Sequence, residues 1–334
     1  MQHWRSKELF PSADGKWSVW RPPFGKRKYG ESAVKRRIWQ WHPLDPVLVT
    51  SPSSSHFEPP VCNAELAPQI HQRMLLQYRL LLALLVVMAL GATAAFSFTR
   101  SSLFANFACA LGLILVFVTT QHVLFFRRID RTAELAKYVS WLHLQRSGLP
   151  LFSISSMLVI GGLQYTLQNQ LGGLTPLIMK YGLVFNIPNS ELWRFFTGPF
   201  MHSGFVHWAG NALLAAVSLG MAAPIAVRSR LFIAGLILLV APPAMLSFMP
   251  PDIRLEAFLG LSGAIFGIFG WVLGISIRRP TLFPANFKWL LAAFLAMIMG
   301  VTSLLNERSN DFVHLTGLII GLSLGLTTYA LRKH

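Results

Sequence analysis

Eight uncharged apolar stretches follow a polar N-terminal region, and they constrain this 334-residue chain more than any other feature. Each is close to the ~20 apolar residues that a helix needs to cross a bilayer. Only 13% of the residues are charged, whereas soluble domains average about 25%. The sequence therefore predicts an all-α polytopic membrane protein. The stretches cover approximately residues 80–98, 103–126, 151–167, 205–223, 231–248, 257–277, 287–305 and 312–331.

The region before these stretches, residues 1–72, is polar and strongly basic. Its apolar residues are scattered without a clear period, so we expect a largely disordered cytoplasmic tail. Most of the 29 Lys and Arg lie in this tail or in the loops on the same side of the membrane as the tail. This bias follows the positive-inside rule, and with eight spans it places both termini in the cytoplasm.

The net charge of +16 would suggest a nucleic-acid partner in a soluble protein. Here the basic residues flank apolar stretches, so the expected partner is the lipid bilayer and no nucleic acid. Two cysteines, Cys62 and Cys109, provide neither a disulfide framework nor a zinc site. We expect no metal ion.

A glycine-rich stretch contains the first candidate functional residue. Gly260, Gly263 and Gly267 recur at steps of three and four residues, and Ser262 lies beside their stripe. Such stripes let two membrane helices approach closely. Taken alone, Ser262 is more simply interpreted as a packing residue.

Other polar residues strengthen the functional interpretation of Ser262. His207 and Asn211 are four residues apart on one helical face, shortly after His202, and His314 begins a second small-residue stripe. The predicted topology puts Ser262, His207, Asn211 and His314 at similar depth near the outer side. Polar groups at such depth are costly and mark a site.

The chemistry that this set would suit is acyl transfer. Ser262 needs a base, and His314 is the well-placed group that titrates near neutral pH. No Asp or Glu lies inside an apolar stretch, so we predict a Ser-His dyad. Asn211, His207 and backbone N–H groups could stabilise an oxyanion.

Four elements of this sequence resemble motifs of the rhomboid intramembrane serine proteases. They are Trp193-Arg194, the helix carrying His202, His207 and Asn211, the Gly260-Leu261-Ser262-Gly263 motif with Gly267, and His314 with Gly317 and Gly321. The resemblance covers about residues 150–332.

The resemblance implies a six-helix core with Ser262 as nucleophile and His314 as general base. It implies that His207 and Asn211 help to form the oxyanion site, and that Trp193 and Arg194 belong to a lateral loop. Substrates would be single-span membrane proteins, and no cofactor would be needed. Phe266 stands where bacterial members often have a tyrosine stacked on the catalytic histidine; a phenyl ring can still stack there.

The predicted organisation has three parts. Residues 1–72 form the tail, residues 73–148 an extra transmembrane hairpin with a polar linker, and residues 149–334 the six-helix domain. The two extra helices lie outside the resemblance. We expect a bacterial inner membrane, with an organelle membrane as the alternative.

Two other functions compete with proteolysis. A catalytically inactive relative could bind or escort membrane proteins, but such relatives typically lose the serine or the histidine. A transporter or channel would favour inverted repeats around a midplane site, and the eight stretches show no internal symmetry.

Overall fold

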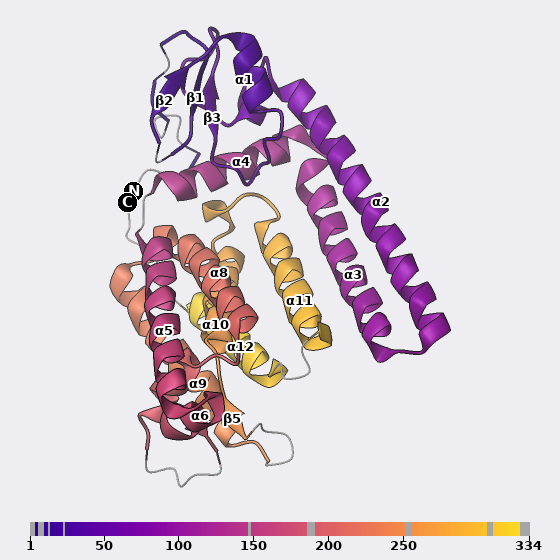
Figure 1. Cartoon of the computed structure of the whole chain (residues 1–334). Helices are drawn as coiled ribbons and strands as arrows, with labels where there is room; N and C mark the ends of the chain where they lie inside the picture. Colours follow the sequence, from indigo (N-terminus) through magenta and orange to yellow (C-terminus); the bar gives the residue numbers. More distant parts are fainter. Residues whose placement is uncertain are drawn as a thin grey trace. The chain divides into compact units, whose positions relative to one another are not determined.

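The computed structural model describes most of the chain, and Figure 1 shows its elements. Contacts divide the chain into two compact units, Met1–Arg146 with Arg279–Glu307 and Ser147–Arg278 with Arg308–His334. The described residues are 4–5, 10–12, 14–22, 24–145, 148–185, 191–250, 256–305 and 310–327.

The first unit begins with a small α/β domain. A three-stranded antiparallel sheet has the strand order β2-β1-β3. The elements of the domain are β1 (Ser18–Trp20), β2 (Lys26–Lys28), α1 (Glu31–Arg37), β3 (Leu48–Thr50) and the 3-10 turn η2 (Pro60–Cys62).

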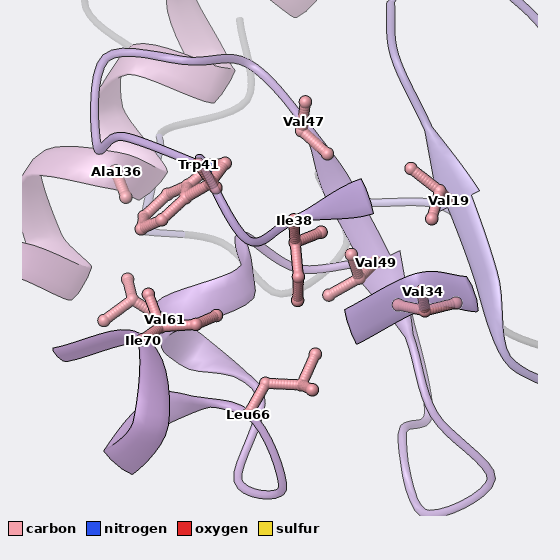
Figure 2. Close-up of a cluster of buried hydrophobic side chains, with 10 residues drawn as sticks. All are labelled: Val19, Val34, Ile38, Trp41, Val47, Val49, Val61, Leu66, Ile70 and Ala136. Atoms are coloured by element: carbon pink, nitrogen blue, oxygen red, sulfur yellow. The ribbon is translucent and has the colours of Figure 1, made fainter. Parts of the chain in front are cut away.

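A buried apolar core holds this domain together. Figure 2 shows its side chains converging from β1, α1, β3, η2, α2, α4 and the segments between them: Val19, Val34, Ile38, Trp41, Val47, Val49, Val61, Leu66, Ile70 and Ala136. The prediction of a largely disordered tail over residues 1–72 is therefore wrong for the described part of that region. Strands of three residues are too short to show an alternating pattern, and the core takes single apolar residues from separate elements, so no period is visible in the sequence.

The helical part of the first unit contains α2 (Ala67–Thr99), α3 (Ser102–Gln121), the π-helical turn η3 (His122–Phe126), α4 (Ile129–Leu144), the 3-10 turn η6 (Pro280–Leu282) and α11 (Phe287–Leu305). Helices α2 and α3 pack side by side after a tight turn at Arg100, which adopts a left-handed conformation. Helix α11 packs on α3, where Phe117 and Phe294 lie with ring centroids 5.8 Å apart. Because α11 groups with α3, the single six-helix domain over residues 149–334 stays a prediction.

The second unit contains α5 (Leu149–Leu171), α6 (Leu174–Tyr181), β4 (Leu183–Val184), α7 (Arg194–Thr197), η4 (Gly198–Phe200), α8 (Phe205–Ala222), η5 (Ala223–Ile225), α9 (Arg228–Ser247), β5 (Ala257–Phe258), α10 (Ser262–Arg278) and α12 (Asp311–Thr327). Strands β4 and β5 pair antiparallel, with Leu183 opposite Phe258. This pairing lies on the approach to α10.

Helices α10 and α12 pack backbone to backbone. A Cβ added at Gly317 would collide with the Gly263 carbonyl, and one at Gly321 would collide with the Gly267 carbonyl. Gly325 meets the carbonyl of Trp271 in the same way. The small residues thus allow the close approach that a glycine stripe predicts in a membrane helix pair.

Six described helices are long and apolar enough to cross a membrane, namely α2, α3 with η3, α5, α8 with η5, α9 and α11. Helices α10 and α12 are shorter apolar helices. The expected helix over 257–277 begins only at Ser262, because Ala257–Phe258 is a strand and Gly260 has φ +101°, which is not helical. The expected end of the last span at residue 331 lies outside the described residues.

Candidate active site

The Ser262 hydroxyl and the His314 imidazole meet in the second unit. Ser262 is the first residue of α10 and His314 lies in the first turn of α12. The distance between Ser262 Oγ and His314 Nε2 is 2.8 Å, which is a hydrogen bond. The close packing of α10 on α12 brings the two side chains together.

Gly260 shapes the approach to Ser262. A Cβ at this position would lie 2.6 Å from His207 Nε2 and 3.2 Å from Asn211 Nδ2. The positive φ of Gly260 also favours glycine. A glycine here lets the backbone before Ser262 pass directly over two polar groups of α8.

Those two groups, on one face of α8, are potential hydrogen-bond donors. Asn211 is buried, and its Nδ2 has no hydrogen-bond partner among the described residues. His207 Nδ1 lies 3.2 Å from Ser203 Oγ, so the hydroxyl can donate to Nδ1 while Nε2 carries the proton and faces Gly260. An unpartnered buried amide is costly unless it receives an acceptor such as an oxyanion.

Phe266 packs on the other side of the base. Its ring stacks on the imidazole of His314, with centroids 4.7 Å apart and planes inclined at 28°. A phenyl ring therefore takes the stacking position that was expected of Phe266. Because Ser262 and Phe266 are four residues apart, one face of α10 carries both the hydroxyl and this ring.

The second nitrogen of His314, Nδ1, lies near the carboxylate of Asp311. His314 Nδ1 is buried and makes no hydrogen bond among the described residues. Asp311 Oδ1 lies 3.9 Å from it, three residues earlier in α12. Asp311 lies one residue before the last apolar stretch of the sequence, and 3.9 Å is longer than a hydrogen bond, so the Ser-His dyad stays a prediction.

His202 makes its hydrogen bonds to Gln164 and to the Phe200 carbonyl, and not to Ser262 or His314. Gln164 of α5 donates to the His202 carbonyl at 2.6 Å and accepts from the His202 N–H at 2.9 Å. The imidazole is buried, lies 3.0 Å from the Phe200 carbonyl through Nδ1, and meets the His207 ring edge-on. Burial, with a smaller effect of His207, lowers the pKa of His202 to about 4, so this ring is neutral at physiological pH. The sequence did not predict this role of Gln164, because Gln164 is one of several polar residues in the C-terminal half of α5.

Trp193 and Arg194 form a structural anchor. The Arg194 guanidinium pairs with Glu191 at 2.5 Å and donates to the Gly182 carbonyl at 2.6 Å. It also lies 4.7 Å from the Trp193 ring centroid. These contacts tie α7 to the turn between α6 and β4, and the structure does not bring either residue to Ser262.

Within the described residues, no group of three or more His, Cys, Asp or Glu is arranged to hold a metal ion. The polar groups beside Ser262 and Gly260 comprise the His314 imidazole and two potential hydrogen-bond donors, Asn211 and His207. Such a set can take a proton from a hydroxyl and stabilise a developing negative charge.

Comparisons with known proteins give the family. A family model described as Rhomboid domain matches residues 189–331. YdcA of Bacillus subtilis (strain 168), a protein named for the rhomboid proteases, is 30% identical over 146 residues, which are 43% of this chain and 70% of YdcA. The chain belongs to the rhomboid family. The rhomboid protease GlpG of Haemophilus influenzae is 26% identical over 148 residues, which are 44% of this chain and 74% of GlpG.

Membership of the rhomboid family confirms two predictions, the family resemblance and the all-α polytopic membrane fold. The protein is a multi-pass integral membrane protein, and its environment is the lipid bilayer. Its family is one of intramembrane proteases. The match to the family model begins at residue 189, so the small α/β domain and helices α2 and α3 lie outside it.

Proposed function

We propose that this rhomboid protein is an intramembrane serine endopeptidase that cleaves single-span membrane proteins within or near their transmembrane helix. The observation that carries the proposal is the 2.8 Å contact between Ser262 Oγ and His314 Nε2. A hydroxyl hydrogen-bonded to an imidazole is the arrangement that activates a serine nucleophile.

Each group has a defined role in the proposed reaction. His314 Nε2 takes the proton of Ser262 as Oγ attacks the carbonyl carbon of the scissile peptide bond. The resulting oxyanion accepts hydrogen bonds from Asn211 Nδ2, from His207 Nε2 and from backbone N–H groups at Leu261 and Ser262. His314 then gives its proton to the leaving amine, and water hydrolyses the acyl-enzyme by the same steps.

The proposed setting is a bacterial inner membrane with the N-terminus in the cytoplasm. The support is the distribution of Lys and Arg, which concentrates on the side of the N-terminal domain. In this orientation Ser262, at the start of α10, opens to the outer side, from which water would reach it.

The second candidate is an inactive rhomboid relative that binds or escorts membrane proteins. The hydrogen bond between Ser262 and His314, and the buried Asn211 amide that has no hydrogen-bond partner among the described residues, favour catalysis over this alternative.

The test is cleavage of a panel of single-span reporters by the full chain, reconstituted in liposomes. We expect wild type to cleave at least one reporter and to react with a serine-directed fluorophosphonate at Ser262. Ser262→Ala and His314→Ala should do neither while inserting normally. Ser276→Ala is the matched control, because Ser276 is a buried serine of α10 whose hydroxyl donates to the Leu273 carbonyl of its own helix. Undiminished cleavage by Ser262→Ala would end the proposal, and binding of reporters without cleavage or labelling would favour the escort function.

A further inference from the structure

A cavity in the first unit lies between α1 and the first turns of α2, which are neighbours in Figure 1. Its volume is about 450 Å³, within the ~300–1,000 Å³ typical of ligand sites. The buried side chains of Ile38, Leu66 and Ile70 form part of its lining. All of its lining residues precede the match to the rhomboid model, so the proposed active site does not account for the cavity.

Three basic side chains also line this cavity, namely Lys35, Arg36 and Arg73. Lys35 is paired with Glu31, one turn earlier in α1, at 2.5 Å. Among the described residues, neither Arg36 nor Arg73 forms a salt bridge. The cavity therefore carries positive charge that no described carboxylate pairs with, which suits an anionic ligand.

The guanidinium of Arg73 is held by its neighbours and still has donors to spare. One Nη donates to the Trp41 carbonyl at 3.3 Å, and Cζ lies 4.8 Å from the ring centroid of Trp39. In the part of the chain that the structure describes, this is one of the five hydrogen bonds that a guanidinium can donate. Arginine binds phosphate oxygens through parallel N–H···O bonds, so a phosphate matches the unused donors.

The course of α2 gives the depth of the cavity relative to the membrane. Helix α2 is a candidate membrane span, and its uncharged stretch begins at Leu80, seven residues after Arg73. Seven residues of helix rise about 10 Å, whereas the polar headgroup layer is roughly 5–8 Å thick on each side of the hydrocarbon. The ring of Trp39 lines the cavity and is 61% exposed, and tryptophan is enriched at the headgroup level. The cavity therefore lies at the outer edge of the headgroup layer.

We propose that this cavity binds the phosphate headgroup of an anionic phospholipid of the membrane that α2 crosses. Arg36 and Arg73 donate charge-assisted hydrogen bonds to the phosphate, and the bound headgroup bridges α1 and α2. Basic pockets beside membrane helices bind such headgroups, and anionic lipids attract basic residues next to a span. An acidic peptide would satisfy the same cations, but the headgroup layer lies beside α2 at all times, and the exposed Trp39 fits that layer better.

The two arginines also have an ordinary interpretation, as charges that hold the chain near an anionic surface and set its orientation. That role depends on the number of basic residues, so loss of any exposed cation of the small domain should weaken lipid attraction alike. A site depends instead on Arg36 and Arg73. Arg27, in the exposed strand β2, lies outside the cavity lining and distinguishes the two roles.

The experiment uses the full chain in nanodiscs of phosphatidylcholine, with or without phosphatidylglycerol. Hydrogen exchange of α1 amides reports occupancy of the cavity, and native mass spectrometry of the solubilised chain, titrated with each lipid, gives the affinity. Arg36→Gln is the first variant, because Arg36 is exposed and its side chain makes no hydrogen bond within the described ranges, so its loss leaves folding intact. Arg73→Gln removes the guanidinium, Arg73→Lys keeps the charge without the fork, and Arg27→Gln is the matched control.

We expect phosphatidylglycerol to slow exchange in α1 and to bind wild type more tightly than phosphatidylcholine does. Arg36→Gln should weaken phosphatidylglycerol binding by about fivefold, as for loss of one cation near an anionic surface. Arg73→Gln should weaken it by about tenfold or more, because charge-assisted bonds to phosphate are lost. Arg73→Lys should fall between Arg73→Gln and wild type, and Arg27→Gln should match wild type.

Equal weakening by Arg27→Gln and Arg36→Gln would overturn the inference, because it would show attraction by total charge without a site. An equal response to the two lipids would overturn it as well. Two further arms in phosphatidylcholine nanodiscs add inorganic phosphate or a polyglutamate peptide. Protection of α1 by either of these, without protection by phosphatidylglycerol, would assign the cavity to a soluble ligand and also overturn the inference. None of these outcomes bears on proteolysis by Ser262.

Discussion

The ring of Phe266 lies flat against the imidazole of His314, with ring centroids 4.7 Å apart. Helix α10 therefore provides both the hydroxyl that His314 contacts and the surface on which His314 rests. Rotation of the imidazole away from Ser262 would have to break this stacking.

Removal of the aromatic face should consequently lower turnover. Stacked aromatic pairs contribute about 0.5–1.5 kcal/mol beyond buried area, so we expect Phe266→Leu to reduce kcat by roughly two- to tenfold. Phe266→Tyr keeps the ring and should stay near wild type. The measurement is steady-state reporter cleavage; equal kcat values in all three proteins would show that the stacking does not orient the base.

The unpartnered amide of Asn211 leads to a second prediction. If Nδ2 receives the oxyanion, Asn211→Ala should lower kcat by about 10²–10³-fold, since one such donor is worth about 2.7–4 kcal/mol. KM should change little, because the interaction forms in the transition state. Asn169→Ala, at an exposed position of α5, is the control. A rise in KM at constant kcat would instead assign Asn211 to substrate binding.

The contact between α10 and α12 gives a prediction on stability. A methyl group at position 321 meets the Gly267 carbonyl, which is backbone and cannot move aside cheaply. Gly321→Ala should therefore destabilise the protein by at least about 1–3 kcal/mol and reduce labelling of Ser262. Gly162→Ala is the matched substitution, because nothing lies within 4 Å of a Cβ there; it should be neutral or stabilising by about 0.5–1 kcal/mol. Thermal unfolding in detergent measures both, and equal midpoints would contradict the packing argument.

The small α/β domain should respond to pH through Glu58. Burial raises the pKa of Glu58, although hydrogen bonds from Asn63 and Ser54 oppose the shift. A carboxyl whose pKa is higher in the folded than in the unfolded state favours folding at low pH, and this contribution is lost as pH rises through the folded pKa. The free energy of unfolding of the domain should therefore decline as pH rises from the pKa of Glu58 in the unfolded state to its higher pKa in the folded state.

Glu58→Gln removes the charge and keeps an acceptor oxygen, so we expect greater protection of β3 amides at pH 7 and a weaker pH dependence. Hydrogen exchange, corrected for intrinsic rates, is the measurement. Greater protection of wild type than of Glu58→Gln at pH 7 would show that the ionised carboxylate stabilises the domain.

Apolar length predicted the six long membrane helices, whereas the stretches that become α10 and α12 form shorter helices than expected. Glycine spacing predicted that α10 and α12 pack closely, because such patterns are local and have a strong physical meaning in a bilayer. The start of α10 could not be placed from the pattern, since Gly260 continues the glycine spacing although its backbone is not helical.

Other features depend on contacts that the sequence does not display. The amide of Gln164 holds the backbone of His202 across 38 residues of chain. The core of the small domain joins β1 with α4, more than 100 residues later, through single apolar side chains such as Val19 and Ala136. Such pairings have no period, so they become visible only in three dimensions.

The seam where Gly317 and Gly321 touch the carbonyls of α10 has a mechanical consequence. Because backbone meets backbone at these glycines, the axes of α10 and α12 lie about as close as two helices can. This short distance between the helices sets the separation of Ser262 and His314. Rotation of either helix about its axis would replace a glycine by a larger side chain at this contact, and that side chain would clash with the backbone of the other helix. We therefore expect α10 and α12 to behave as one stiff part, with the motions that admit a substrate confined to other elements.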